Sequence, residues 1–443
     1  MVQLLKVQEQ AILKSRNHAR YGLFMEMGLG KTLTVLHEFA MFYNMKKVDV
    51  MVVFCPNSLV RTWKNEVEKH GYDFPVKVKP GKGDRVEAGD LVIYNYESII
   101  ATPGEKIPLL LSQHRCYCVF DESVQIKNFK SARWKKIRGW MDQMHMVRLL
   151  SGRPMVQNAM DLWSQLKILG GKVNNSPYAY RNKFCRMGGW MGKVIVGINN
   201  EDELRDIMRE VSWTATKKEW TNLPEKLYTT REYEMTAEQK RVYKQMFKDM
   251  VVEIKDKMIT VDQAVHKYSK LQQVTSGFMI DEDGNATPIM DFDKVPKVKL
   301  LDEILEEVSG KVIIFAHYRA TVEALAARYG CAVIRGGMTE DEIGAAMDRF
   351  NNSMEQVMVC QSTAAKYGLT LLGNDQMGCN TTVYFENNYS LDARIQSEDR
   401  NHRHGQKNPV LYIDLVGTPV ESRIIRALQA KDGLSKAVQE IST

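Results

Sequence analysis

The sequence predicts an α/β protein with two lobes, each built on a parallel β-sheet. Short apolar runs alternate with amphipathic stretches along both halves of the chain. This alternation is typical of buried parallel strands joined by crossover helices. A charged, helical and strand-poor stretch separates the two halves. The 443 residues are enough for about two or three domains.

The expected elements follow from these patterns in chain order. In the first half, we expect strands at residues 50–54, 91–94, 116–120 and 147–150, and helices at 59–70 and 161–169. The middle is expected to be helical at residues 201–210, 237–254 and 261–274. In the second half, we expect strands at 312–316, 332–335, 356–360, 382–385 and 410–415, and helices at 320–329 and 340–350. We place the boundary near Leu223 and Pro224, which gives a first lobe of residues 1–222 and a second lobe, with a helical insertion, of residues 223–443.

The composition is that of an ordinary globular protein, with 44% hydrophobic and 26% charged residues. The formal net charge of +7 permits a nucleic-acid partner without requiring one. No apolar run approaches the roughly 20 residues that span a bilayer, and the first residues do not resemble a signal peptide. We therefore expect a cytoplasmic protein with no membrane partner.

The seven cysteines are scattered along the chain, and their number is odd. This argues against a disulfide scaffold and fits a reducing compartment. Cys116 and Cys118 are the only close pair. They lie on an expected strand with no second Cys/His pair nearby, so buried thiols are favoured over a zinc site.

A glycine-rich segment at residues 27–32, Met-Gly-Leu-Gly-Lys-Thr, follows the apolar residues 21–24 and precedes a helical pattern. Strand, glycine-rich turn, Lys-Thr and helix are the context of a phosphate-binding loop. In such a loop, backbone N–H groups and the helix N-terminus bind phosphate oxygens. We expect Lys31 to reach the β- and γ-phosphates and Thr32 to ligate Mg²⁺. The strict spacing G-x-x-x-x-G-K-T fails at Met25, so a glycine-containing helix cap is the alternative.

Two carboxylates, Asp121 and Glu122, end the apolar run 116–120. An aspartate at a strand end can hold Mg²⁺ through water, and the adjacent glutamate can orient or deprotonate the attacking water. Two exposed acids at a strand end are the alternative. The pair follows the phosphate loop within the same predicted lobe, and together the two motifs favour hydrolysis of a nucleoside triphosphate.

Arg400 and Arg403 lie three residues apart within segment 396–406, near the end of the second lobe. On a helix this spacing places both guanidinium groups on one face, where they suit the negative charge of a triphosphate in its transition state. A solvated charged helix face is the alternative. A two-lobed nucleotide motor needs cationic groups from its second lobe, which favours the functional interpretation.

These motifs, in this order, resemble those of the Swi/Snf-type DNA translocases of helicase superfamily two. The segments that carry the resemblance are 27–32, 54–66, 121–128, 150–158, 223–226, 362–371 and 396–406. The last nearly matches the family's Q-x-E-D-R-x-H-R-x-G-Q, and residues 126–128 match its I-K-N. The resemblance extends over nearly the whole chain and implies two RecA-like lobes that close on ATP and Mg²⁺.

The resemblance also implies roles for individual residues. The ATP-binding residues would be Gln8, Met27, Gly28, Leu29, Gly30, Lys31 and Thr32. Thr32 and Asp121 would hold Mg²⁺, Glu122 would position the attacking water, and Arg400 and Arg403 would neutralise the γ-phosphate. The DNA contacts would be Arg61, Trp63, Lys127, Asn128, Lys366 and Thr370. Coupling between the ATP and DNA sites would involve Gln157, Thr370 and Gln396.

The sequence departs from the family pattern at four positions. Met25, Val124, Arg153 and Tyr367 stand where the family has Asp, His, Thr and a small residue. The family's histidine helps to couple hydrolysis to DNA binding, so these departures bear on the strength of coupling. The predicted catalytic set is intact. Ser123 and the string Ala-Ala-x-x-Gly-Leu-Thr most resemble a distant subgroup that includes annealing helicases.

The predicted function is therefore ATP-dependent translocation on double-stranded DNA, without sequence specificity, by a monomer. The chain is little longer than the motor, which favours fork or branch remodelling, or displacement of bound protein, and hints at a viral or bacterial source. The sequence also leaves open whether the chain has a protein partner. One alternative is a strand-separating or RNA-directed helicase of the same superfamily. Another is a non-hydrolysing DNA-binding scaffold with a vestigial nucleotide site.

Overall fold

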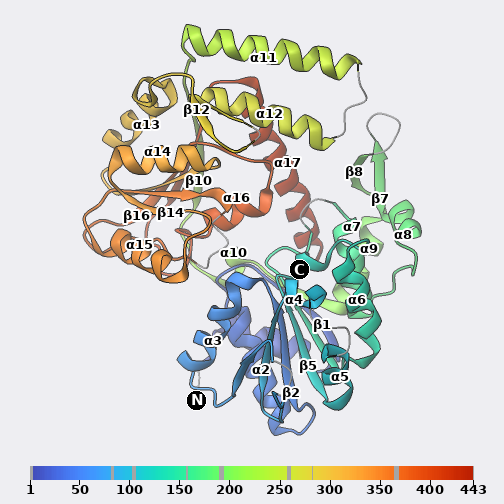
Figure 1. Ribbon diagram of the computed structural model, residues 1–443. Helices are drawn as coiled ribbons and strands as arrows, with labels where there is room; N and C mark the ends of the chain where they lie inside the picture. Colours follow the sequence, from blue (N-terminus) through green and yellow to red (C-terminus); the bar gives the residue numbers. More distant parts are fainter. Residues whose placement is uncertain are drawn as a thin grey trace. The chain divides into compact units, whose positions relative to one another are not determined.

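The computed structural model describes residues 3–80, 84–101, 106–155, 158–188, 194–256, 261–281, 283–363 and 369–442. The chain divides into two compact units, residues 1–222 with 431–443 and residues 223–430. Each unit contains one large sheet whose strands all run parallel, covered by helices (Figure 1). The predicted α/β class with two parallel sheets is confirmed. None of the described helices combines the length and the apolar character that a bilayer crossing requires.

The first sheet has seven strands in the order β3-β4-β2-β5-β6-β1-β9. Their bounds are β1 Arg20–Met25, β2 Val50–Cys55, β3 Val76–Val78, β4 Leu91–Asn95, β5 Cys116–Asp121, β6 Met146–Leu150 and β9 Ser212–Ala215. Every residue of β2, β4 and β5 is buried, which explains their unbroken apolar runs. Only β6 separates β1 from β5, so the segments that follow these two strands start at the same edge of the sheet.

Helices cover both faces of the first sheet. Helices α1 (Lys6–Ser15), α2 (Lys31–Asn44) and α3 (Val60–Lys69) pack on one face. The other face is covered by α4 (Tyr96–Ala101), α5 (Lys106–Gln113), α6 (Ala132–Trp140), α7 (Met160–Leu169), α8 (Pro177–Phe184) and α9 (Glu201–Val211). The short α10 (Lys217–Trp220) and an antiparallel pair, β7 (Cys185–Gly188) with β8 (Val194–Ile198), complete the described elements of this unit, apart from short 3-10 turns.

The second sheet has six strands in the order β10-β17-β16-β13-β15-β14. Their bounds are β10 Lys226–Glu232, β13 Lys311–Ala316, β14 Ala332–Ile334, β15 Val357–Gln361, β16 Cys379–Tyr384 and β17 Val410–Val416. The helices of this unit are α11 (Ala237–Asp256), α12 (Val261–Thr275), α13 (Pro296–Glu307), α14 (Arg319–Tyr329), α15 (Glu340–Asn352), α16 (Leu391–Glu398) and the first part of α17 (Pro419–Ser442), whose residues from 431 onward belong to the first unit. A small antiparallel pair, β11 (Phe278–Ile280) with β12 (Ala286–Pro288), follows α12.

Two expectations need correction, and two edge strands were not expected. The sequence pattern groups residues 201–210 with the helical middle, but they form α9, whose apolar side packs on the first sheet. The sequence pattern does not predict the edge strands β9 and β10: β9 is only four residues long, and β10 is mostly exposed and reads Lys-Leu-Tyr-Thr-Thr-Arg-Glu. The helix expected to carry Arg400 and Arg403 ends at Glu398, so both arginines lie in the turn that follows α16.

A fully buried ion pair lies inside the first unit. Arg148 on β6 donates from Nε and Nη2 to the two carboxylate oxygens of Glu38 on α2, at 2.8 and 2.9 Å, and both side chains are 0% exposed. Replacing Arg148 by methionine is expected to lower the free energy of unfolding of this unit by about 3–5 kcal/mol, because the Glu38 carboxylate stays buried without its partner.

Urea unfolding, followed by circular dichroism, measures this effect. The matched control is Lys172→Met, which breaks an exposed pair with Glu210 (2.9 Å; side chains 77% and 51% exposed). The control is expected to change the same free energy by less than about 1 kcal/mol. Equal losses in the two variants would contradict the assigned role of the buried pair.

Candidate nucleotide and DNA site

The candidate phosphate loop connects β1 to α2. Its two glycines, Gly28 and Gly30, have φ values of +86° and +76°, a backbone conformation that other residues rarely adopt. A Cβ at Gly30 would also lie 2.1 Å from Nε2 of Gln8. Leu29, between the glycines, is buried and anchors the loop in the core. Lys31 opens α2 and donates from Nζ to the carbonyl of Met25 at 2.9 Å.

Gln8 on α1 lies directly against this loop. Its side chain is 2% exposed, its Nε2 donates to the carbonyl of Gly30 at 3.1 Å, and its Oε1 accepts from the backbone N–H of Leu5 at 2.8 Å. The structure thus brings the residue expected to read the adenine base next to the loop expected to bind the phosphates. Thr32, the expected Mg²⁺ ligand, is the second residue of α2 and is half-buried.

The acidic pair ends β5. Asp121 is 5% exposed, and its Oδ1 accepts from the backbone N–H of Glu122 at 3.0 Å. Burial raises the pKa of the Asp121 carboxyl above its ordinary value, while the nearby Lys31 ammonium and a hydrogen bond from Trp63 act in the opposite direction. Glu122 has φ +51° and ψ +57°. Such left-handed backbone at a residue other than glycine is strained, and strain of this kind clusters at active sites.

Two further segments of the first unit lie against the phosphate loop. A Cβ at Gly152, in the loop after β6, would lie 3.5 Å from the backbone nitrogen of Met27. After β9, the backbone N–H of Lys217 donates to Oε2 of Glu26 at 2.6 Å, and the buried Lys217 side chain extends to the loop, with Cε 3.7 Å from a Cβ built on Gly28. Sequence reasoning missed Lys217, since no motif surrounds it. Gln157, the expected coupling residue, is outside the described residues.

In the second unit, the two arginines converge on one carbonyl group. Arg403 donates from Nη1 to the carbonyl of Leu369 at 2.9 Å, and Arg400 donates from Nη1 to the same oxygen at 3.4 Å. Arg400 also donates from Nε to the carbonyl of Gln396 at 2.7 Å and is 2% exposed. Arg403 is half-buried. The turn after α16, rather than a helix face, therefore brings the two guanidinium groups together.

A buried charged network supports this arginine turn, and the sequence did not indicate it. Lys226, at the start of β10, contacts Glu398 at 3.0 Å and Asp399 at 3.8 Å. Burial acts to lower the pKa of Lys226, but these two carboxylates outweigh it and raise the pKa to about 12. His402 Nε2 lies 2.7 Å from the carbonyl of Pro224. The first residues of the second unit are thus fixed to the turn that carries Arg400 and Arg403.

The expected DNA contacts have different environments. Arg61 and Asn128 are exposed, Lys127 forms an ion pair with Asp161 at 3.4 Å, and Lys366 lies outside the described residues. The backbone carbonyl of Thr370, a half-buried residue, accepts from Asn351 at 2.8 Å.

Trp63 needs correction as a DNA contact. Its side chain is 0% exposed, and its indole N–H donates to Oδ2 of Asp121 at 3.0 Å. It is a buried neighbour of the acidic pair and does not present its ring to solvent.

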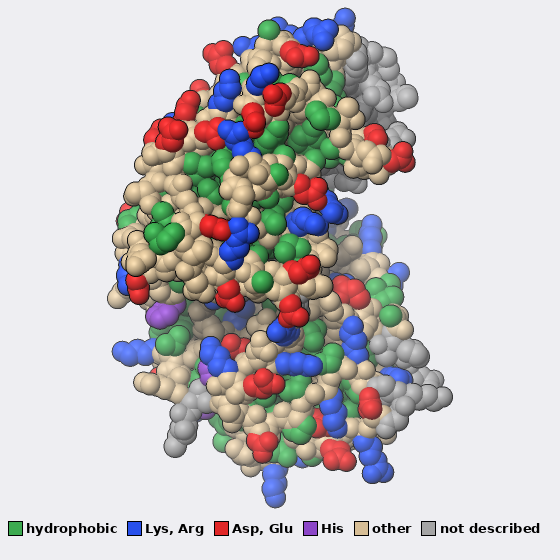
Figure 2. Space-filling model, turned by 60° about the vertical axis from the view of Figure 1, so that its left-hand side comes forward, with side chains coloured by type: hydrophobic (Ala, Val, Ile, Leu, Met, Phe, Trp, Pro, Cys, Tyr) green, Lys and Arg blue, Asp and Glu red, His purple; other side chains and the backbone are tan. Residues whose placement is uncertain are grey.

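The face of the molecule shown in Figure 2 carries charges of both signs. In the view of Figure 2, lysine and arginine side chains are interspersed with aspartate and glutamate. The mixture of charges on this face fits the mild net charge of +7.

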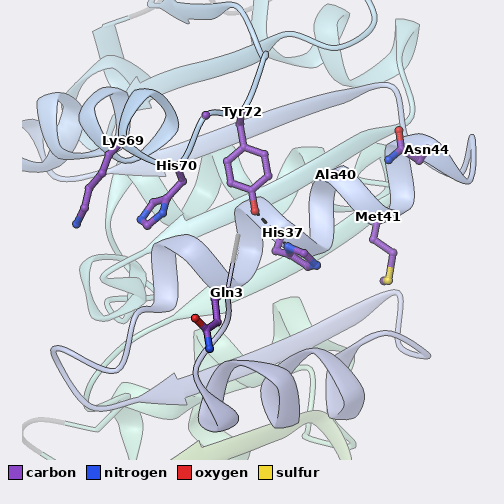
Figure 3. A pocket seen from close by; sticks show the side chains of 9 residues that line it. Gln3, His37, Ala40, Met41, Asn44, Lys69, His70 and Tyr72 are labelled. Atoms are coloured by element: carbon purple, nitrogen blue, oxygen red, sulfur yellow. Dashed lines mark hydrogen bonds between the residues drawn. The ribbon is translucent and has the colours of Figure 1, made fainter. Parts of the chain in front are cut away.

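A pocket of about 650 Å³ opens beside α2 in the first unit (Figure 3). His37, Met41 and Asn44 of α2 line it, together with Gln3 and the segment from Lys69 to Tyr72. His37 Nδ1 and the Tyr72 hydroxyl lie 3.2 Å apart, joined by the dashed line in Figure 3. The phosphate loop does not line this pocket, so the pocket lies apart from the acidic pair and the glycines.

Known proteins match the chain over both units. The SNF2-related domain family matches residues 12–279, and the helicase conserved C-terminal domain matches residues 296–405. A phosphate loop and an acidic pair at one sheet edge define the class of nucleotide hydrolases. The chain belongs to the SNF2-related family, a family of helicase-type ATPases.

Several relatives are long proteins. The chain is 25% identical to nuclear protein STH1/NPS1 of Saccharomyces cerevisiae, over 96% of this chain and 34% of that protein. It is 24% identical to the transcription regulatory protein SNF2 of the same yeast, over 96% and 27%. It is 25% identical to the Caenorhabditis elegans homolog of SWI/SNF-related matrix-associated actin-dependent regulator of chromatin subfamily A-like protein 1, over 91% and 57%. The chain thus spans about a third of the length of the yeast relatives.

Among solved structures, the chain is similar to the Sulfolobus solfataricus SWI2/SNF2 ATPase core in complex with dsDNA. The TM-score is 0.45 and the sequence identity 21%, over 100% of this chain and 95% of that one.

Proposed function

We propose that this chain is a translocase that moves along double-stranded DNA and is driven by ATP hydrolysis. The observation that carries the proposal is the arrangement of the first sheet, where the phosphate loop after β1 and the acidic pair after β5 start at the same edge. Family membership supplies the motor class. The arginine turn of the second unit supplies the cations that such a motor needs.

In this proposal, Lys31 and the backbone N–H groups of the loop bind the β- and γ-phosphates of ATP. Thr32 and Asp121 offer hydroxyl and carboxylate oxygens, the donors that Mg²⁺ prefers, so these residues fit the ion. When bound, Mg²⁺ would neutralise charge on the phosphate oxygens. Glu122 orients the attacking water, and Arg403 with Arg400 acts on the γ-phosphate when the lobes close.

The proposed DNA contacts are made with phosphates, which give affinity without sequence readout. Arg61 and Asn128 are the exposed candidates in the first unit, and Thr370 is a candidate in the second. Lys127 would exchange its ion pair with Asp161 for a DNA phosphate. Loss of the γ-phosphate after hydrolysis would reopen the lobes. The two lobes would bind the DNA in turn, and this would move the chain along the duplex.

The test is steady-state ATP hydrolysis with duplex DNA, single-stranded DNA, RNA or no nucleic acid, combined with displacement of a triplex-forming strand. We expect the strongest stimulation by duplex DNA and ATP-dependent triplex displacement, both absent in Lys31→Ala. Unwinding of a tailed duplex, or stimulation by RNA alone, would favour a strand-separating or RNA-directed helicase. Tight DNA binding with no hydrolysis, unchanged in Lys31→Ala, would favour a non-hydrolysing scaffold.

A further inference from the structure

Two buried aromatic side chains hold Asp121 from segments that lie before it in the chain. The indole N–H of Trp63 on α3 donates to Asp121 Oδ2 at 3.0 Å, and the hydroxyl of Tyr96 on α4 donates to the backbone carbonyl of Asp121 at 2.8 Å. Trp63 is 0% exposed and Tyr96 is 1% exposed. Both bonds therefore lie in a low-dielectric interior, where they are strong and where their loss leaves a buried partner unsatisfied.

The same two segments face solvent next to these aromatic residues. Arg61 is exposed and precedes Trp63 by two residues on α3, which places the two side chains about 200° apart around the helix. One side of α3 thus faces solvent while the other contacts Asp121. Glu97, the neighbour of Tyr96 at the start of α4, is also exposed.

The two segments are joined to each other as well. Asn95, the last residue of β4, donates from Nδ2 to Oδ1 of Asn57, just after β2, at 2.7 Å. Strands β2 and β4 are direct neighbours in the sheet, so this side-chain bond links the two segments that follow them. The Tyr96 ring also lies under the Arg133 guanidinium, at 4.9 Å.

We infer that Trp63 and Tyr96 are positioning residues that transmit DNA binding to Asp121 and so set the DNA-stimulated rate of hydrolysis. This inference rests on the proposed function, because it assumes that the α3 segment contacts DNA. Each aromatic side chain acts through Asp121: Trp63 fixes the orientation of its carboxylate, and Tyr96 fixes the backbone that carries it.

The test compares Trp63→Phe and Tyr96→Phe with two matched controls. Tyr96→Phe removes only the hydroxyl donor, and Trp63→Phe removes the indole N–H together with part of the ring. Trp163→Phe removes the bond from a buried indole N–H to the carbonyl of Asn174 (3.0 Å), and Tyr180→Phe removes a buried hydroxyl bond to the carbonyl of Ala159 (3.1 Å). All four residues lie in the first unit and are at most 2% exposed. The controls therefore account for the general cost of losing a buried donor.

Three quantities are measured for each variant: DNA affinity by fluorescence anisotropy, affinity for a fluorescent ATP analogue with and without Mg²⁺, and ATP turnover with and without saturating duplex DNA. In Trp63→Phe and Tyr96→Phe, we expect unchanged DNA affinity and unchanged Mg²⁺-free nucleotide affinity. The ratio of DNA-stimulated to basal turnover should fall by about 10-fold or more. The Trp163→Phe and Tyr180→Phe controls should keep the ratio of the unmodified chain.

The outcomes separate the inference from the proposed function. A normal stimulation ratio in both test variants, or the same loss in the controls, overturns the inference alone. An equal fall of basal and stimulated turnover also overturns it, because Asp121 would then be supported without regard to DNA. An unmodified chain that no DNA stimulates would remove the proposed function and the inference together. If Trp63→Phe fails to fold, as judged by circular dichroism, Tyr96→Phe decides the question.

Discussion

Replacing Glu122 by glutamine is expected to reduce DNA-stimulated ATP hydrolysis by about 100- to 10,000-fold, the range that a positioned acid–base group contributes. The change removes a carboxylate that can accept a proton from water but keeps the size of the side chain. ATP affinity should stay near that of the unmodified chain, because Lys31 and the loop glycines are untouched. The affinity is measured with a fluorescent ATP analogue and the turnover by release of inorganic phosphate.

The control for this prediction is Glu210→Gln, which alters an exposed carboxylate in the same unit, with 51% side-chain exposure. It should leave both affinity and turnover unchanged. Near-normal turnover in Glu122→Gln would contradict the catalytic role of Glu122. The left-handed backbone of this residue would then not indicate an active site. Loss of ATP affinity together with turnover would instead indicate a damaged loop.

Replacing Arg403 by alanine is expected to lower DNA-stimulated turnover by about 1,000-fold, the scale of an arginine that stabilises a phosphoryl-transfer transition state. The fold should persist, since Arg403 is half-buried and donates one described hydrogen bond, to the carbonyl of Leu369. Arg400→Ala should behave differently. Arg400 is 2% exposed and contacts the carbonyls of Gln396 and Leu369, so its loss should also lower the midpoint of thermal unfolding.

Turnover and thermal unfolding of the two variants are measured beside Arg319→Ala. Arg319 is an exposed arginine of the second unit that pairs with Glu323 at 2.8 Å on the same helix. This control should retain both activity and unfolding temperature. If Arg403→Ala hydrolysed ATP at the normal rate with DNA present, the arginine turn would have a structural role only.

The sequence alone was sufficient for the fold class and for the residues that end the key strands. Buried parallel strands such as β2 and β5 are unbroken apolar runs because both of their faces are covered, and this makes them visible without coordinates. The phosphate loop is equally visible, since Gly28 and Gly30 are needed for their positive φ values. The catalytic roles of these residues stay predictions until the variants are measured.

Edge strands and long-range contacts could not be read from the sequence. Strand β10 is polar and mostly exposed, so its pairing with β17 depends on the completed sheet rather than on a local pattern. A tryptophan in a helical pattern gives no sign of the partner that its indole N–H will find. The fold places Trp63 against Asp121, 58 positions away in the chain.

Arg400 and Arg403 show the same difference between what the sequence determines and what the tertiary structure determines. The spacing of Arg400 and Arg403 is a property of the sequence, and so is their chemical fitness for a triphosphate. Both guanidinium groups donate to the carbonyl of Leu369 in the tertiary structure. The end of α16 at Glu398 and the pairing of Lys226 with Glu398 hold the turn that carries them. Local sequence specifies which groups are present and which backbone they favour. Only the packed tertiary structure decides which buried donors and charges meet, because those partners come from distant parts of the chain.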